Sequence, residues 1–229
     1  MILEHDGKRP HIYAGVRIAP NAVVCGDVTI GAGTSIGFGA VLTAESGPIT
    51  IGADCVIMDT AVLRGVRRHP LTIGDNVLVG PRAYLSGCEV GDSVFVATGA
   101  AVFNGARLAD FSQVRINGVV HIKTRLAKGE VVPIGWVAVG DPARTLPADR
   151  HDEIWAVQQQ LDFPETVFGI DPEARRGRSL MEMMPDVMPR YARFLGRHCD
   201  DREVQPPSLK RRALAWARAP TFTGISRGP

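Results

Sequence analysis

Apolar residues recur at about every sixth position from Ile18 to Leu126, with a few interruptions. Read in sixes, the chain gives IAPNAV, VCGDVT, IGAGTS and IGFGAV, and then, after interruptions, IGADCV, IMDTAV, IGDNVL, VGPRAY, VGDSVF, VATGAA and further segments as far as LAKGEV. A helix would place apolar residues about every 3.6 positions and a strand every 2. A period of six is typical of a chain that turns a corner after each short strand, so that three segments make one triangular coil.

The hexads therefore predict a mainly β fold, a left-handed parallel β-helix of hexapeptide repeats with a C-terminal helical extension. The first position is Ile, Val or Leu and should point inward, and the fifth is small and should lie beside a corner. We expect Gly at the second position to supply turn dihedrals that other residues disfavour. About eighteen hexads should stack as about six coils.

Two segments, 43–50 and 64–72, interrupt the period and should project as loops. We expect the β-helix over residues 1–145, a helical extension over 146–200 and a basic, mobile tail over 201–229. In the extension, helical spacing follows Asp149, the expected N-cap, and an amphipathic, Met-rich stretch covers about residues 180–195.

The composition gives no sign of a nucleic-acid or membrane partner. The formal net charge is only +2, so no global field recruits nucleic acid, and no apolar run reaches the roughly 20 residues of a membrane span. The N-terminus is charged from its fourth residue and does not resemble a signal peptide. The four cysteines form no CxxC pair, which fits burial in a reducing compartment. We expect a cytoplasmic protein.

Several stretches match one family in register as well as in period. The segments GKRPHIYAGVRIAPNAVVCGDVTIG, GPITIGADCVIMDTAVLRG, TIGDNVLVGPRAYLSGCEVGDSVFVATGAAV and VPIGWVAVGDPAR resemble the γ-carbonic anhydrase-like family of hexapeptide-repeat proteins over about residues 5–146. The resemblance implies a homotrimer with sites at the three subunit interfaces.

In that family three histidines bind zinc or a related ion, and here their places are Arg64, Pro81 and Ser86. The family's Arg-x-Asp reads Thr43-Ala44-Glu45, and of its Gln-Asp pair only Asp59 remains. A catalytic zinc needs three protein ligands, so we expect no metal and no other cofactor. The six remaining histidines show no metal-ligand spacing: His5, His11, His69, His121, His151 and His198. A substitute site using His69 and His121 is the alternative.

The replaced positions suggest an anion site in the interface cleft. Arg64, helped by Arg82, would grip a carboxylate or phosphate with its planar fork of donors, unless it forms an internal ion pair with Asp59 or Glu45. Arg67 and Arg68 are interpreted as solvated loop charges. Candidate catalytic residues are Arg64, Ser86, Tyr84, Asp59, Glu45 and His69, and candidate ligand-binding residues are Arg64, Arg82 and Asn104, with Arg115 and Asn117 as weaker candidates.

Three functions remain open at this point. The first is a metal-free trimer that binds or transforms a small anionic metabolite between subunits and is not a zinc carbonic anhydrase. The second is a hexapeptide-repeat acyltransferase using acyl-CoA, with His69 or His121 as the base. The third is a non-catalytic trimeric scaffold.

Overall fold

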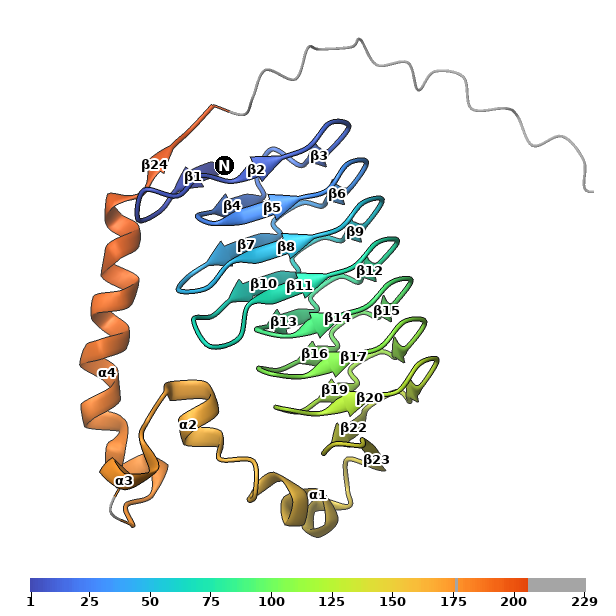
Figure 1. Cartoon of the computed structure of the whole chain (residues 1–229), viewed down its shortest axis with the longest axis vertical. Helices are drawn as coiled ribbons and strands as arrows, with labels where there is room; N and C mark the ends of the chain where they lie inside the picture. Colours follow the sequence, from blue (N-terminus) through green and yellow to red (C-terminus); the bar gives the residue numbers. More distant parts are fainter. Residues whose placement is uncertain (176, 206–229) are drawn as a thin grey trace, which may run out of the picture.

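A computed structural model describes residues 1–175 and 177–205 and shows a parallel β-helix followed by helices (Figure 1). The expected tail, residues 201–229, lies outside the described residues from residue 206 onward. The parallel β-helix with a C-terminal helical part, predicted from the hexads, is confirmed.

Three sheets form the sides of the coil. The first pairs strands in the order β23 (Arg144–Pro147), β22 (Trp136–Val139), β19 (Val119–Val120), β16 (Ala101–Val102), β13 (Tyr84–Ser86), β10 (Val62–Gly65), β7 (Val41–Ala44), β4 (Val23–Cys25), β1 (Ile2–Glu4) and β24 (Arg202–Glu203). The second comprises β2 (His11–Ile12), β5 (Val28–Ile30), β8 (Ile49–Ile51), β11 (Leu71–Ile73), β14 (Glu89–Val90), β17 (Arg107–Leu108) and β20 (Arg125–Leu126). The third comprises β21 (Val131–Val132), β18 (Gln113–Val114), β15 (Phe95–Val96), β12 (Leu78–Val79), β9 (Val56–Ile57), β6 (Ser35–Ile36) and β3 (Arg17–Ile18).

The stack is longer than the expected six coils. Two of the sheets hold seven strands each, so seven full coils are present. The number of coils predicted from the hexads was too low for two reasons. The coil also includes residues before Ile18, where the hexad pattern is weak, and residues around the two interrupting loops.

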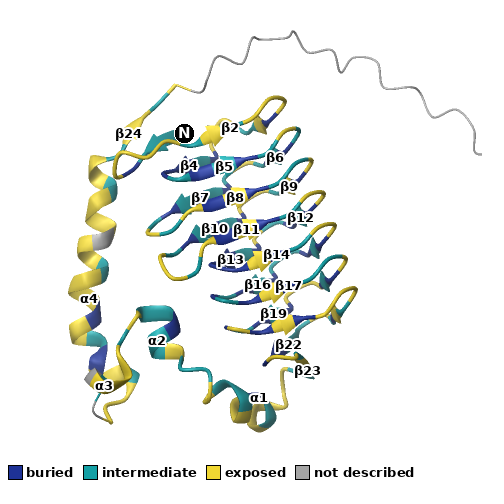
Figure 2. Cartoon of the chain, viewed as in Figure 1, coloured by how far each residue is buried: buried dark blue, intermediate teal, exposed yellow. Residues whose placement is uncertain are grey.

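The interior of the coil matches the hexad assignment. First-position residues such as Ile30, Leu63 and Val96 are buried, and so are fifth-position residues such as Ala40 and Thr34. Figure 2 shows buried residues along the strands of every coil, with exposed residues at many of the turns and on parts of the strands. Branched aliphatic side chains therefore stack from coil to coil, and this apolar column is the main source of stability.

The corners use a different position from the one predicted. Positive φ angles fall at the fourth residue of the hexad, which is Gly33 at 75° and Gly39 at 65° but also Arg82 at 57° and Asn117 at 54°. The second-position glycines have ordinary φ angles, so the expectation that they supply turn dihedrals is wrong. They are small because the neighbouring coil passes too close: a Cβ on Gly52 would lie 2.6 Å from the backbone carbonyl of Gly74.

Aspartates connect the coils at the same corner. The Asp75 carboxylate accepts a hydrogen bond from the backbone N–H of Ala53 at 2.7 Å, and Asp92 accepts one from Asp75 at 2.8 Å. Asp110 in turn accepts one from the N–H of Asp92 at 2.9 Å. A Gly-Asp pair at this corner thus satisfies a backbone donor that the turn leaves without a ladder partner.

The chain then leaves the coil and returns along it. Helices α1 (His151–Gln158), α2 (Phe163–Phe168), α3 (Pro172–Arg175) and α4 (Leu180–Gly196) and the 3-10 helix η1 (Arg197–Asp200) lead back to the N-terminal end, where β24 lies beside β1 (Figure 1). Arg150, and not Asp149 as predicted, precedes α1, and no side chain caps it. None of the helices in the described ranges is long and apolar enough to cross a membrane.

Candidate functional site

Arg64 lies at the centre of a polar cluster on the outer side of the ten-stranded sheet. Its Nη2 donates to Glu45 Oε2 at 2.5 Å, its Nε donates to the other carboxylate oxygen, and its Nη1 donates to the Tyr84 hydroxyl at 3.1 Å. The two partners of the ion pair are largely covered, with side-chain exposures of 29% and 12%. The internal ion pair with Glu45, left open by the sequence, is therefore formed.

The electrostatics of this pair keep the guanidinium charged. Burial is the largest influence and acts to lower the pKa of Arg64, but the hydrogen bonds and charge of Glu45, with a smaller effect of Tyr84, hold that pKa above its ordinary value. Two of the guanidinium donor groups are committed to Glu45, and Nη1 remains the donor that points to Tyr84.

Aromatic residues extend the cluster along the coils. The Tyr84 ring lies 5.7 Å from that of Phe103, which lies 6.5 Å from the His121 ring. Tyr191 of α4 is close enough for Arg64 and Glu45 to act on its pKa, which burial raises. Burial also lowers the pKa of His121, whose Nδ1 is buried with no hydrogen-bond partner among the described residues. No sequence pattern pointed to Tyr191, because it lies outside the hexads and about 130 positions from Arg64.

The three positions where the resemblance implies histidine ligands do not meet within one chain. Arg64 and Ser86 are register partners on β10 and β13, and Ser86 is buried. Pro81 and Arg82 lie in the turn before β13, and the Arg82 backbone N–H donates to the carbonyl of Asp59. The turn of Asn117 stacks on the same corner, where Asn117 donates to Thr98. Arg82 and Asn117 are exposed there, as is Arg115.

Two other candidates serve the fold in this structure. The Asp59 carboxylate accepts from the backbone N–H of Phe38 at 2.7 Å, and it makes no ion pair with Arg64. Asn104 is buried under α2, where its side-chain amide donates to the carbonyl of Thr166 at 3.4 Å. Both side chains are therefore occupied by structural contacts.

His69 lines a separate basic groove. The loop after β10 carries it, and the groove, of about 430 Å³, is bordered by cationic side chains and two acids: Arg68, Arg107, Lys123, Arg125, Glu89 and Asp141. Burial, followed by the positive charges of Lys123 and Arg68, lowers the pKa of His69, so the imidazole is neutral at pH 7. Arg68, interpreted as a solvated charge, pairs with Glu165 of α2 at 3.1 Å and remains mostly exposed.

Among the described residues, His69 and His121 are not part of a group of three or more potential metal ligands. Within residues 1–175 and 177–205, a group of at least three potential ligand atoms within reach of one another occurs at His5, Cys25, His198 and Asp201. Sequence spacing did not reveal this group because His5 and Asp201 are 196 positions apart.

Comparisons with known proteins agree with this architecture. The family model "Bacterial transferase hexapeptide (six repeats)" matches residues 9–44, and "Hexapeptide repeat of succinyl-transferase" matches residues 70–104. Gamma carbonic anhydrase 1, mitochondrial, of Arabidopsis thaliana is 34% identical over 158 residues, which cover 66% of this chain and 55% of that protein. The chain is a γ-carbonic anhydrase-like hexapeptide-repeat protein.

Other relatives have different names. The carnitine operon protein CaiE of Escherichia coli K12 is 28% identical over 163 residues, 71% of this chain and 80% of that protein. A hexapeptide transferase family protein from Anaplasma phagocytophilum has a solved structure with 27% identity and a TM-score of 0.45, covering 71% of this chain and 92% of that chain. The chain spans about half the length of the plant γ-carbonic anhydrases that it matches.

Proposed function

We propose that this γ-carbonic anhydrase-like protein binds or transforms a small anionic metabolite and is not a zinc carbonic anhydrase. The observation that carries the proposal is the pairing of Arg64 with Ser86, on adjacent strands, at two of the places where the resemblance implies zinc-binding histidines. A guanidinium is permanently charged and repels a divalent cation, but it recognises carboxylate and phosphate groups through two parallel hydrogen bonds.

The proposed site needs a second copy of the chain. Pro81 and Arg82 lie at the far end of β13 from Arg64, so one chain cannot bring all three replaced positions around one ligand. A trimer would place Arg82 of one subunit opposite Arg64 of the next. We expect light scattering at micromolar concentration to give three times the mass of the 24.6 kDa chain, and a monomer would contradict the interface site.

The ion pair between Arg64 and Glu45 predicts how substitution of either residue should change anion binding. A carboxylate ligand competes with Glu45 for the same guanidinium, so Glu45→Gln should tighten binding, by about tenfold, because it removes a competing charge. Arg64→Lys keeps the charge but loses the planar fork, and should weaken binding by about tenfold or more.

A thermal-shift screen of small carboxylates first selects the compound that stabilises the wild-type protein most. Calorimetric titration then measures the affinity of wild type and of each variant for that carboxylate. Arg67→Ala is the matched control, because Arg67 lies on the exposed loop after β10, and it should change affinity far less. Equal affinities for wild type, Arg64→Lys and Glu45→Gln would show that Arg64 serves only the internal ion pair.

The groove at His69 favours acyl transfer as a second candidate function. A neutral imidazole is suited to be a general base, and Arg107, Lys123 and Arg125 border the groove with charges suited to phosphates of an acyl-CoA. Including CoA esters in the same screen separates the candidates. A response to CoA esters that is lost in Lys123→Ala but kept in Arg64→Lys would favour the groove, and no response to any compound would favour a scaffold.

A further inference from the structure

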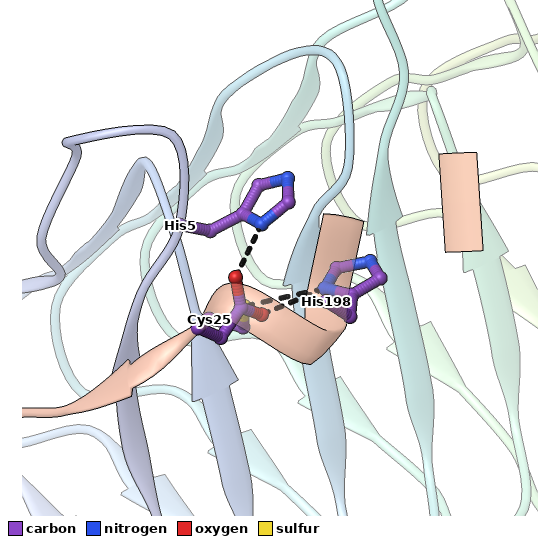
Figure 3. Close-up of side chains that lie close together, drawn as sticks. His5, Cys25 and His198 are labelled. Atoms are coloured by element: carbon purple, nitrogen blue, oxygen red, sulfur yellow. Dashed lines mark hydrogen bonds and ion pairs between the residues drawn. The ribbon is translucent and has the colours of Figure 1, made fainter. Parts of the chain in front are cut away.

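Two parts of the chain that are remote in sequence meet at the N-terminal end of the coil. His5 follows β1, Cys25 ends β4, and His198 and Asp201 come from η1 and the residue that follows it. Figure 3 shows His5, Cys25 and His198 pointing toward one another, with dashed lines for the interactions that join the group. The C-terminal segment is fixed beside this group because β24 pairs antiparallel with β1.

The four side chains present their polar atoms to a common centre. The two oxygens of Asp201 accept hydrogen bonds from Nδ1 of His5 at 2.6 Å and from Nδ1 of His198 at 2.8 Å. The Cys25 thiol also donates to Asp201, at 3.2 Å, and the two imidazole rings stack with centroids 4.5 Å apart. One potential ligand atom from each of the four residues lies within 4.8 Å of all the others.

We propose that His5, Cys25, His198 and Asp201 form a structural zinc site. Sulfur, nitrogen and oxygen donors at about 2.0–2.3 Å around a tetrahedral Zn²⁺ lie about 3.5 Å from one another, so small side-chain movements close the observed group around one ion. The Cys25 thiol that now donates to Asp201 releases its proton to solvent when it binds the ion. The resulting thiolate and the Asp201 carboxylate supply two negative charges, which match the charge of the ion.

The unpartnered nitrogen of His5 supports a metal-bound state. Because Nδ1 of His5 carries the proton that it donates to Asp201, Nε2 of the same ring can only accept a hydrogen bond. This Nε2 atom is buried and has no hydrogen-bond partner among the described residues. When Nδ1 binds a metal the proton moves to Nε2, and the Asp6 carboxylate, 3.7 Å away, is placed to accept it. Such an outer carboxylate is the usual companion of a zinc-bound histidine. Metal binding thus supplies the contact that the metal-free group lacks.

A catalytic role for Cys25 does not fit this environment. Cys25 is buried and its thiol is held by the Asp201 carboxylate, whereas a nucleophilic cysteine must be reached by its substrate. The side chains of His5 and Asp201 are only 3% and 5% exposed, so no open position is left for a substrate. A closed group of four ligands is typical of structural zinc, which here would fasten the C-terminal segment to the first coils.

The test uses the full chain, freed of metal by chelator dialysis and titrated with Co²⁺ and then with Zn²⁺ against a chromophoric chelator. We expect one equivalent per chain, a thiolate-to-cobalt charge-transfer band, and displacement of cobalt by zinc. Cys25→Ala should abolish the band and weaken zinc binding at least about a hundredfold, because even the loss of an outer partner costs 10–100-fold. Cys199→Ala, at the exposed neighbouring cysteine, should change neither.

His198→Gln gives a second test at a position that tolerates change, since this side chain is partly exposed. It should weaken zinc binding, and zinc should raise the melting temperature of this variant less than that of wild type. Zinc should raise the melting temperature of wild type and of Cys199→Ala but not of Cys25→Ala. Absence of the cobalt–thiolate band in wild type, or equal zinc affinity in wild type and Cys25→Ala, would overturn the proposal.

Discussion

Gly52→Ala is expected to lower the free energy of unfolding by about 3 kcal/mol or more, the upper part of the range for overpacked cores. The added Cβ would lie 2.6 Å from the carbonyl carbon and oxygen of Gly74 and 2.3 Å from Asp75 Oδ1. The backbone of the next coil cannot retreat without breaking its own ladder, and moving Asp75 releases the N–H of Ala53. Chemical denaturation followed by circular dichroism measures the change.

Gly129→Asn is the matched control for this substitution. Gly129 has no heavy atom within 4 Å of an added Cβ, and its φ of 72° resembles the 57° and 54° at which Asn76 and Asn117 stand in equivalent turns. Because Asn tolerates the left-handed region, the change should cost less than about 1 kcal/mol. If Gly52→Ala costs no more than Gly129→Asn, the second-position glycines are not required by the distance between coils.

The architecture was predictable from the sequence because each hexad contributes the same inward residue. A repeated local pattern defines a repeated local structure, so Ile30, Val96 and their equivalents could be placed without knowledge of distant contacts. The positive φ angles of the turns were assigned to the wrong hexad position because glycine is common in this chain for two reasons. It is required where the backbone of the next coil passes close by, and it is favoured where φ is positive. Only the structure separates Gly52, which serves the first, from Gly33, which serves the second.

The candidate site was predictable only in part. Arg64, Tyr84 and Ser86 could be placed together because strand register follows from the hexads. The choice of Glu45 over Asp59 as the partner of Arg64 depends on the course of the loop after β7, where the period is interrupted. Tyr191 and the cluster around Asp201 depend on how the C-terminal helices fold back, which no repeat encodes.

Purified wild-type protein is expected not to accelerate the hydration of carbon dioxide. With or without added zinc, the rate should equal the rate measured in buffer alone. Zinc catalyses this reaction by lowering the pKa of its bound water to about 7, which supports turnover of about 10⁶ s⁻¹ in zinc enzymes. Such a zinc ion needs three protein ligands and an open position. Arg64 repels the ion, Pro81 has no side-chain donor, and Ser86 is a buried hydroxyl that does not ionise at pH 7. Stopped-flow measurement with a pH indicator tests this directly.

The proposed zinc at Cys25 does not alter this expectation, because its four protein ligands leave no position for water. Wild type, Cys25→Ala and Arg64→Lys should therefore all remain at the background rate. Zinc-dependent hydration that is lost in Arg64→Lys would show that the replaced family site is active, and would contradict the proposed function. Zinc-dependent hydration that is lost only in Cys25→Ala would show instead that the ion at the N-terminal end is open to water, and that the site there is catalytic, not structural.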